Sequence, residues 1–518
     1  MVVPELRAWR AARPHVVRVA RTVKPHVVRV TRAVRPRPVK VTTLQLTAVS
    51  ATVGLALAAA VATAAGPWDS SGQRTAERDW AASRPGQGGA DHGRDPGAAA
   101  GGPRPAPSAA SVLAGLGGAT VSAPVPAEKA LADVLDPLLK DPSLGTRHSA
   151  AVVDLATGRR LYGTGSADAL TPASTTKIAT AVAALTAAGA DHRITTRAAL
   201  EPDTGEVVLV GGGDPTLTAR KKRDGDWASL RTLAARTARA LEARKLDEVT
   251  LSYDTSLYAG PGQPPAGVEG NIAQVTPLMV DEGRLDDSTS GAAGRSPDPA
   301  ADAARKFAEL LKDEGIRTTS PGPSKATGRS KPLAEVQSPP LSALVERMLT
   351  NSDNDIAEAL ARQTALAAGE PASFAGGATA IRAQLKKLDI PLKGAVFADG
   401  SGLNRSDKLS ADLLTALLAK AGDPAHPELR PALTGLPVAG FTGTLSQRYA
   451  DGAVRSATGV VRAKTGTLTG VNALAGTVVD TDGRLLAFAF LADGTTDRTT
   501  AQTALDRTAS ALAACGCR

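Results

Sequence analysis

The chain has 518 residues, too many for one compact core, and its apolar fraction of 42% excludes a wholly disordered protein. With 6 Phe, 4 Tyr and 4 Trp residues, the core must be built largely from Ala, Val and Leu. The net charge of +9 is unevenly distributed: residues 1–40 hold 11 Lys and Arg residues and one acid, Glu5, whereas the rest carries 49 basic and 50 acidic side chains. We therefore expect no nucleic-acid partner for the main part of the chain.

The basic N-terminal stretch contains an 11-residue repeat. Arg-Pro-His-Val-Val-Arg-Val at 13–19 recurs as Lys-Pro-His-Val-Val-Arg-Val at 24–30, and in degenerate form at 35–41. A proline in every copy interrupts helical hydrogen bonding, so we expect an extended or broken cationic segment. It either adheres to anionic lipid or nucleic acid, or forms the cytoplasmic flank of a membrane segment, and the sequence that follows favours the flank.

Residues 41–65 are an uncharged, mostly apolar stretch, long enough to cross a hydrocarbon core of about 30 Å. Small residues at 62–64 also fit a cleaved signal peptide, but the long basic region before the stretch favours an uncleaved anchor. Everything after about residue 66 is expected outside the cell membrane, attached by a single pass or secreted if the segment is cleaved. Residues 66–125, rich in Gly, Pro, Ser and Ala, predict a disordered linker.

Globular character begins near residue 149, where two short strands joined by a turn at Thr157 and Gly158 are predicted. The following TPASTTKIATAVAALTAAGA predicts a helix that starts at Pro172. Its apolar stripe comprises Ile178, Val182, Ala183 and Leu185. Ser174 and Lys177, three residues apart, would share a face of this helix. A partly desolvated lysine can take the proton of a serine hydroxyl, so the pair is a candidate nucleophile and base.

A second motif, Ser352-Asp353-Asn354, lies between two stretches with helical apolar spacing. The spacing predicts a turn or break between helices at this point. A second serine hydroxyl can carry a proton between a lysine and a leaving group, and an amide can hold a substrate carbonyl. Because Ser, Asp and Asn are also preferred helix N-caps, capping alone is the alternative.

The third motif is Lys464-Thr465-Gly466-Thr467, in RAKTGTLTGVNALAG. The residue alternation around it predicts edge and central strands of an antiparallel sheet. An edge strand can pair with an extended peptide, and Lys and Thr side chains can bind its carboxylate. Gly466 has no side chain to obstruct that approach.

Together and in this order, the three motifs resemble the signature of penicillin-binding proteins and related β-lactamases. Residues 125–518 are similar to the serine D-alanyl-D-alanine carboxypeptidase/endopeptidases, the class C low-molecular-mass penicillin-binding proteins. The segments that carry this resemblance besides the motifs are LVGGGDPTL at 209–217, ADGSGLNRSDKLS at 398–410, GTLSQRY at 443–449 and RAKTGTLTGVNALAG at 462–476.

The resemblance implies an α/β (α+β) fold with a penicillin-binding/β-lactamase-like transpeptidase domain, in which an antiparallel sheet is flanked by helices and joined by an all-helical subdomain. This catalytic domain would comprise residues 126–194 and 336–518. Lys177 and Ser352 are separated by 174 residues, more than such a core needs. Enzymes of this class carry extra domains at this point, so the strand- and turn-rich residues 195–335 are expected to form a smaller inserted domain.

The resemblance also implies a role for each motif residue. Ser174 would be the acylated nucleophile, Lys177 its base, Ser352 the proton relay and Asn354 the holder of the substrate amide, while Lys464, Thr465, Gly466 and Thr467 would receive the terminal carboxylate and the peptide backbone. The N–H groups of Ser174 and Thr467 would form the oxyanion hole. The implied substrates are peptidoglycan stem peptides, β-lactams would be covalent inhibitors, and neither a metal nor another cofactor is required.

Two other functions remain possible from the sequence. A β-lactamase-like hydrolase of class A would use a glutamate acting through a water, but no Glu-x-x-x-Asn follows the Ser-Asp-Asn motif. A non-catalytic wall-binding protein on the same fold would not need all three motifs intact. Cys515 and Cys517, at the end of the chain, either pair with each other or another chain, or are two thiols without catalytic consequence.

Overall fold

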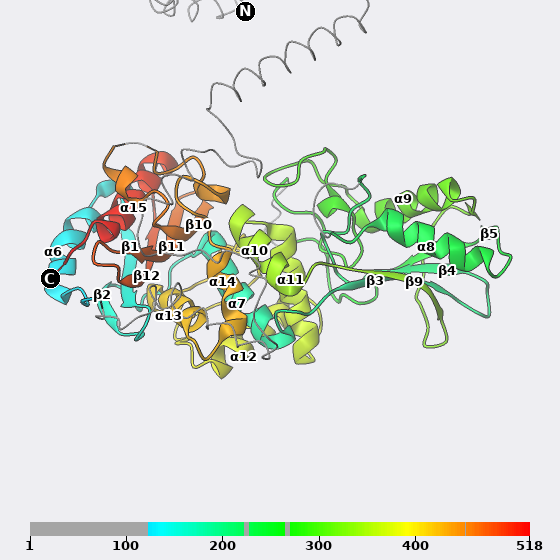
Figure 1. Ribbon diagram of the computed structural model, residues 1–518, viewed down its shortest axis with the longest axis horizontal. Coiled ribbons are helices and arrows are strands. Elements are labelled where there is room, and N and C mark those ends of the chain that lie inside the picture. The colour runs from blue at the N-terminus through cyan, green and yellow to red at the C-terminus, as the bar shows by residue number, and fades with distance from the viewer. Residues whose placement is uncertain (1–122, 222–226, 265–269, 451, 518) are drawn as a thin grey trace, which may run out of the picture. The chain divides into compact units, whose positions relative to one another are not determined.

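The computed structural model describes residues 123–221, 227–264, 270–450 and 452–517 (Figure 1). The predicted basic tail, the apolar segment and nearly all of the predicted linker lie outside these residues. Among the helices that are described, none is both long and apolar enough to cross a membrane.

A five-stranded antiparallel sheet is built from both ends of the described chain, with strand order β10-β11-β12-β1-β2. The strands are β1 (Arg147–Asp154), β2 (Arg160–Thr164), β10 (Arg462–Leu468), β11 (Val471–Val479) and β12 (Leu485–Asp493). The pairing of β1 with β2 confirms the predicted hairpin. Strand β10 carries the Lys-Thr-Gly motif and lies at the edge of the sheet, as the sequence predicted.

Helices cover both faces of this sheet. Ala150 of β1 belongs to the core under α6 (Glu128–Leu139) and α15 (Arg498–Ala513), whereas its neighbour Ala151 belongs to the core that includes α13 (Ala411–Gly422). This is the two-residue alternation expected of a strand that is buried on both sides. The small alanines allow the helices to approach closely, in keeping with the low aromatic content of the chain.

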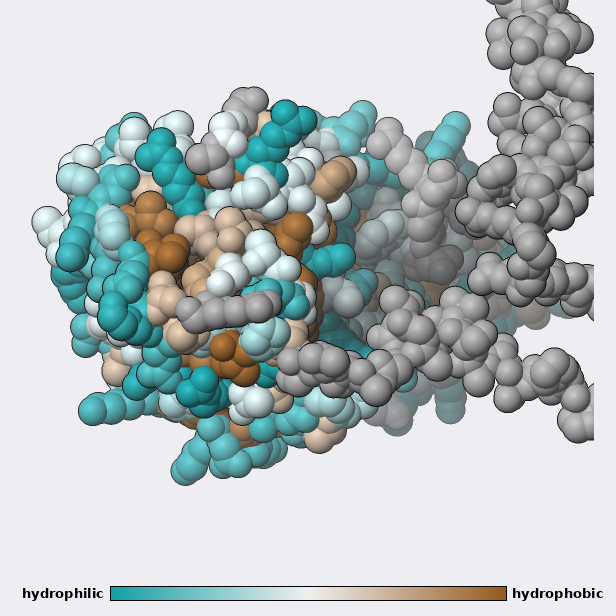
Figure 2. Space-filling model, turned by 60° about the vertical axis from the view of Figure 1, so that its left-hand side comes forward, coloured by the Kyte–Doolittle hydropathy of each residue, from teal (hydrophilic) through white to brown (hydrophobic). Residues whose placement is uncertain are grey.

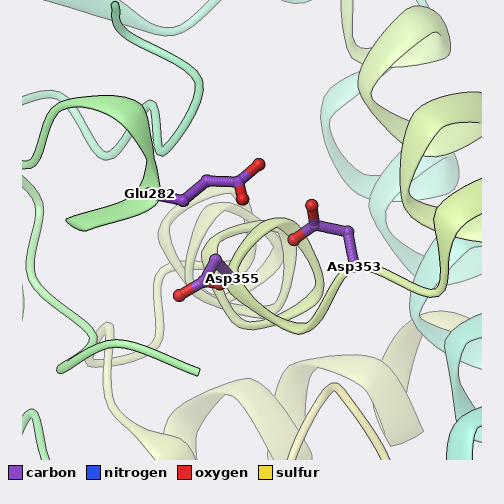
Figure 3. Close-up of side chains that lie close together, drawn as sticks. All are labelled: Glu282, Asp353 and Asp355. Atoms are coloured by element: carbon purple, nitrogen blue, oxygen red, sulfur yellow. The ribbon is translucent and has the colours of Figure 1, made fainter. Parts of the chain in front are cut away.

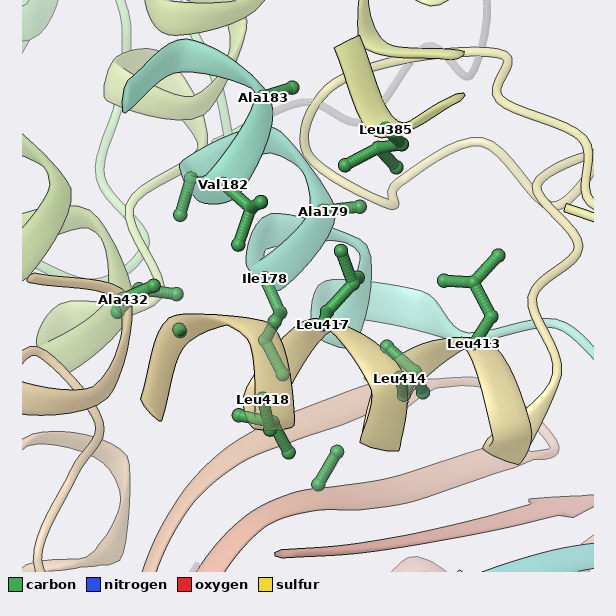
Figure 4. Close-up of a cluster of buried hydrophobic side chains, with 14 of the residues drawn as sticks. Ile178, Ala179, Val182, Ala183, Leu385, Leu413, Leu414, Leu417, Leu418 and Ala432 are labelled. Carbon is green, nitrogen blue, oxygen red and sulfur yellow. The ribbon is translucent and has the colours of Figure 1, made fainter. Parts of the chain in front are cut away.

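Helix α7 (Thr176–Ala188) lies at the centre of a helical layer. It contacts α11 (Asn354–Ala368), α12 (Phe374–Lys387) and α10 (Leu341–Asn351), and α13 packs between it and the sheet (Figure 4). Every residue of α7 from Thr176 to Leu185 is buried. The predicted apolar stripe is therefore present, but it is not the only buried face of the helix. The small Ala and Thr residues on the other sides are buried as well.

The chain between α7 and α10 forms a second five-stranded sheet with its own hydrophobic core. Its order is β8-β6-β4-β3-β9, and the pairs β4–β6 and β6–β8 are parallel. The strands of this sheet are β3 (Thr195–Leu200), β4 (Val207–Val210), β6 (Leu251–Asp254), β8 (Gly322–Pro323) and β9 (Lys331–Gln337). The same part of the chain also contains a separate two-stranded sheet, β5 (Glu248–Val249) and β7 (Arg317–Thr318), and the helices α8 (Leu230–Glu242) and α9 (Pro299–Asp313). The sequence predicted strands and turns here but not the two amphipathic helices.

The two cysteines form a disulfide with each other, one of the possibilities left open by the sequence. Both are buried in the core under α6 and α15. The main-chain oxygen of Cys517 also accepts a hydrogen bond from Ala127 N, 2.7 Å, next to the start of α6. The C-terminal end is thus fastened to the first described helix.

Among the described residues, large apolar side chains reach the surface at few positions, of which Leu285 and Phe441 are the most exposed. On the face shown in Figure 2, hydrophobic residues occur in small separate groups between hydrophilic ones. Scattered exposed apolar residues of this kind are normal for a folded protein and do not by themselves indicate a docking surface.

Candidate active site

Ser174 lies on a short 3-10 turn, Ala173–Thr175, immediately before α7. The sequence predicted it on the α-helix itself, and the structure places it one turn earlier. The preceding residue, Ala173, has φ +47°, a left-handed conformation that alanine rarely adopts. Strain of this kind persists only where the surroundings enforce it, and here it orients the serine at the helix entrance.

Lys177, the second residue of α7, makes three hydrogen bonds through its side-chain nitrogen. Its Nζ lies 3.1 Å from Ser174 Oγ, 2.6 Å from Asn354 Oδ1 and 2.7 Å from the main-chain oxygen of Ser401. The side chain is fully buried, whereas Ser174 and Asn354 are only half buried. The structure therefore brings the first two motifs together around the buried amine of Lys177.

Burial lowers the pKa of Lys177 to about 8. The charges of nearby carboxylates act in the opposite direction, with Asp399 contributing most. A lysine in this range is neutral in a useful fraction of molecules near neutral pH and can act as a base.

The Ser-Asp-Asn motif forms the link between α10 and α11, as predicted. Ser352 ends α10 in a left-handed conformation, φ 57°, and Asp353 is the N-cap of α11, accepting a hydrogen bond from Ile356 N, 3.0 Å. Capping is therefore real, but it is performed by Asp353 alone. Ser352 and Asn354, on either side of it, contact the two motif lysines.

Lys464 of β10 is the second fully buried lysine of the site. Its Nζ donates hydrogen bonds to Ser352 Oγ and to the main-chain oxygen of Thr465, both 2.8 Å. Burial, and then the charge of Lys177, lower its pKa well below the usual lysine value. In contrast to Lys177, no carboxylate among the described residues raises this pKa, so an anion bound beside Lys464 would favour its ammonium form.

The remaining residues of the third motif lie beside this lysine. Thr465 Oγ1 donates to Thr444 Oγ1, 2.9 Å, and Thr467 Oγ1 accepts from Gln502 Nε2, 3.2 Å. Thr444 belongs to the GTLSQRY segment, which had no predicted role of its own. Thr467 is half buried and remains accessible at the end of the strand.

Gly466 is required for a reason that differs from the predicted one. A Cβ at this position would lie 2.5 Å from the main-chain oxygen of Pro172 and 3.3 Å from Ala173 Cβ. The missing side chain therefore allows β10 to pack against the turn that holds Ser174, rather than simply leaving room for a substrate.

Sequence reasoning missed the buried carboxylates that hold the Ser401 carbonyl towards Lys177. Asp399 accepts hydrogen bonds from the N–H groups of Ser401 and Gly402, at 3.0 and 2.6 Å. Glu358 of α11 accepts from the N–H groups of Gly400 and Ser401, at 3.0 and 2.9 Å, and its other oxygen binds Arg362. The only sequence signal for Asp399 was the resemblance of the segment at 398–410, which assigned it no role, and Glu358 of α11 lies outside that segment.

The same loop contains a second buried acid, Asp407. Its Oδ1 accepts from Ala398 N, 2.6 Å, and burial together with the adjacent Asp399 raises the pKa of Asp407 to about 9. Asp407 therefore favours its neutral form and helps to hold the loop through the Ala398 N–H group.

One group of acidic side chains in the described part of the chain is compact enough to suggest a metal site. It consists of Glu282, Asp353 and Asp355, whose carboxylate oxygens lie within 4.8 Å of one another (Figure 3). Arginines contact two of these carboxylates, Arg284 at Glu282 and Arg295 at Asp355. The group is adjacent to the active site but does not include either lysine.

Comparison with known proteins shows the family of the chain. Residues 131–296 and 286–514 match the D-Ala-D-Ala carboxypeptidase 3 (S13) family. The chain belongs to this family. It is 39% identical over 420 residues to Carboxypeptidase DacB of Mycolicibacterium smegmatis, covering 80% of this chain and 90% of the relative. It is 36% identical over 426 residues to Carboxypeptidase Rv3627c of Mycobacterium tuberculosis, with the same coverage.

The S13 family assignment confirms the resemblance inferred from the three motifs. The fold is also confirmed by a crystal structure of penicillin-binding protein 4 from Haemophilus influenzae, with a TM-score of 0.60 over 73% of this chain and 97% of that protein. At 20% identity this likeness concerns the fold alone.

We predict that Gly402→Ala slows acylation of this S13 enzyme by a penicillin by about 100-fold, the effect of a displacement of roughly 1 Å at a reacting group. A Cβ at Gly402, which has φ +80°, would lie 1.9 Å from the main-chain oxygen of Ala173, so the turn bearing Ser174 must move. The measurement is the second-order rate of labelling by a fluorescent penicillin.

Gly369→Ala is the matched control, because Gly369 has φ +75° with nothing within 4 Å of its added Cβ. We expect it to lower the free energy of unfolding by about 1 kcal/mol and to leave the labelling rate unchanged. Equal labelling rates for Gly402→Ala and the unaltered protein would show that the loop does not position Ser174.

Proposed function

We propose that this D-Ala-D-Ala carboxypeptidase cleaves the terminal peptide bond of peptidoglycan stem peptides by acyl transfer to Ser174. The observation that carries the proposal is the 3.1 Å contact between Lys177 Nζ and Ser174 Oγ. A serine hydroxyl is a weak nucleophile until a base removes its proton, and burial makes this lysine easier to deprotonate.

The acylation step follows from these contacts. Neutral Lys177 takes the hydroxyl proton as Ser174 Oγ attacks the carbonyl carbon of the penultimate D-alanine, and the N–H groups of Ser174 and Thr467 stabilise the oxyanion. When the C–N bond breaks, the leaving amine takes a proton from Ser352. Lys464, 2.8 Å from Ser352 Oγ, replaces that proton. D-alanine leaves, and an ester remains on Ser174.

Hydrolysis of the ester restores the starting protonation. An attacking water gives its proton through Ser352 to the now neutral Lys464, and Lys177 returns its proton to Ser174 Oγ as the ester bond breaks. The cycle requires Lys177 neutral and Lys464 charged when the substrate is bound. The terminal carboxylate supplies this condition, because an anion beside Lys464 favours its ammonium form.

Asn354 is suited to hold the substrate. Its Oδ1 accepts from Lys177, and its Nδ2 donates to the main-chain oxygen of Asn271, 2.9 Å. A side-chain amide has two N–H donors, so a second hydrogen remains for a substrate carbonyl. The protein contacts also fix which way the amide faces.

The site gives little support to the β-lactamase alternative. Glu358, a buried glutamate close to the lysine, accepts two main-chain N–H groups through one oxygen and Arg362 through the other. It is therefore poorly placed to activate a water for rapid deacylation. A β-lactam would instead remain on Ser174, because its leaving group stays attached after the ring opens.

We predict that a fluorescent penicillin labels the protein covalently and that Ser174→Ala abolishes labelling and the release of D-alanine from a D-Ala-D-Ala peptide. Ser446→Ala serves as a control for a serine outside the three motifs, and we expect it to keep both activities. Label that persists on Ser174→Ala would reject the nucleophile assignment. Many turnovers of penicillin per enzyme would instead favour a β-lactamase.

We also predict that the acylation rate at low penicillin concentration rises with pH around the Lys177 pKa of about 8 and falls again at higher pH, where the Lys464 ammonium is lost. The base works only when neutral, so activity is lost as the pH falls and the Lys177 ammonium form accumulates. Lys177→Ala should remove the rise on the acid side and reduce the maximal rate by at least about 100-fold. Lys129→Ala, at an exposed lysine, should preserve the wild-type profile; an unchanged profile in Lys177→Ala would assign the base elsewhere.

The proposed substrate lies outside the cell membrane, so we extend the proposal to attachment through residues 41–65. We predict that the full chain stays with membranes after an alkaline carbonate wash, because an apolar span is held by the hydrocarbon core. A chain lacking residues 1–65 should be released. Release of the full chain by the wash would indicate cleavage or peripheral binding instead.

A further inference from the structure

The acidic group next to the active site joins two distant parts of the chain. Glu282 lies on a 3-10 turn, Asp281–Gly283, in the chain between α7 and α10. Asp353 and Asp355 lie at the start of α11, and Figure 3 shows the carboxylates of Glu282 and Asp353 facing each other, with Asp355 beside them. All three side chains are at least nine-tenths buried.

Two of the carboxylates are paired with arginines. Glu282 contacts Arg284 at 2.8 Å and Arg347 at 3.1 Å. Asp355 contacts Arg295 at 2.9 Å. The three guanidinium groups occupy oxygens of Glu282 and Asp355, so little carboxylate charge is left to bind a divalent cation at the centre. This set of neighbours does not fit a metal site.

Asp353 is the exception, since no arginine pairs with it among the described contacts. Its Oδ1 caps α11, but its Oδ2 is buried and has no hydrogen-bond partner. Glu282 is the group that faces it. A buried carboxylate oxygen without a donor is unfavourable, and a proton held on the opposing carboxyl group would satisfy it.

We propose that Glu282 is a positioning residue for the carboxypeptidase reaction, and that in its protonated form it donates a hydrogen bond to Asp353 and fixes the Ser352–Asn354 turn. The inference rests on the proposed function, because Ser352 and Asn354 are the residues that the turn presents to the two lysines. Glu282 belongs to the segment between α7 and α10, for which the sequence predicted no role.

A single residue, Asp353, separates Glu282 from the two motif residues that contact the lysines. Asp353 lies between Ser352, which is bound to Lys464, and Asn354, which is bound to Lys177. Ser352 has a left-handed backbone that must be held by its surroundings. A shift of Asp353 therefore displaces the proton relay and the substrate amide together.

Other contacts from the same segment support this role. Asn271 O accepts from Asn354 Nδ2, and Ala273 N donates to Asp355 Oδ1, 2.8 Å. The segment thus touches Asp353, Asn354 and Asp355 in succession, the first through Glu282 and the other two through main-chain groups. These contacts add to those that the two lysines make with Ser352 and Asn354.

The charges around Glu282 determine how its proposed hydrogen bond to Asp353 responds to pH. Burial, and then Asp353, raise the pKa of Glu282 to about 7, while Arg347 and Arg284 lower it. Arg295 lies 4.0 Å from the same carboxylate, and the neighbouring Asp281 is directed to Thr218 and Arg220. Because the pKa is raised, the hydrogen bond to Asp353 is present at low pH and is lost as the pH rises through about 7.

The test is the rate of acylation by a fluorescent penicillin, measured from pH 6 to pH 9 for the unaltered protein, Glu282→Gln and Glu282→Ala. Glutamine has the shape of the acid and keeps an N–H donor at every pH. We expect Glu282→Gln to match the unaltered protein at pH 6 and to exceed it by about threefold or more at pH 9, where the carboxyl donor is lost. Glu282→Ala should be about tenfold slower at pH 6.

Glu314→Gln, at an exposed glutamate of the same segment, is the matched control and should give a ratio of one throughout. A ratio of Glu282→Gln to unaltered protein that stays constant from pH 6 to pH 9 would falsify the proposal even if Glu282→Ala fails to fold. Acceleration of the unaltered protein, but not of Glu282→Gln, by added magnesium would show a cation site instead. Loss of labelling in the unaltered protein would count against the proposed function, not against this inference.

Discussion

The site depends on the burial of one lysine amine. Removed from water, Lys177 Nζ is stabilised by groups from three segments that are far apart in sequence: Ser174 at the entrance of α7, Asn354 at the start of α11 and the Ser401 carbonyl. Each of these groups must be held to within a few tenths of an ångström for the amine to be both buried and hydrogen-bonded. Much of the surrounding structure serves to hold these three groups in place around the amine.

The two motif lysines differ because their surroundings differ. Carboxylates oppose the effect of burial on Lys177, whereas burial and a neighbouring positive charge both lower the pKa of Lys464. An incoming carboxylate opposes that lowering and favours the ammonium form of Lys464. Substrate binding therefore prepares the protonation states that acyl transfer requires, and a molecule without a terminal carboxylate would leave the site in the wrong state.

The sequence predicted what local patterns can encode. The break between α10 and α11, the edge position of β10 and the motif lysines all follow from periodicity and residue type. It could not predict the supports, because Glu358 and Asp399 act on a loop through contacts that leave no fixed spacing. It also missed the reason for Gly466, since only the folded chain shows that the turn at Pro172 packs against it.

Ser174, and not the second serine of the site, is proposed to form the covalent intermediate. The most direct test is peptide mapping by mass spectrometry after the protein has reacted with benzylpenicillin and has been quenched in acid. We expect one penicilloyl group, on the peptide that contains Ser174 and localised to that residue by fragmentation. A penicilloyl group on Ser352, or on a residue outside the three motifs, would contradict it.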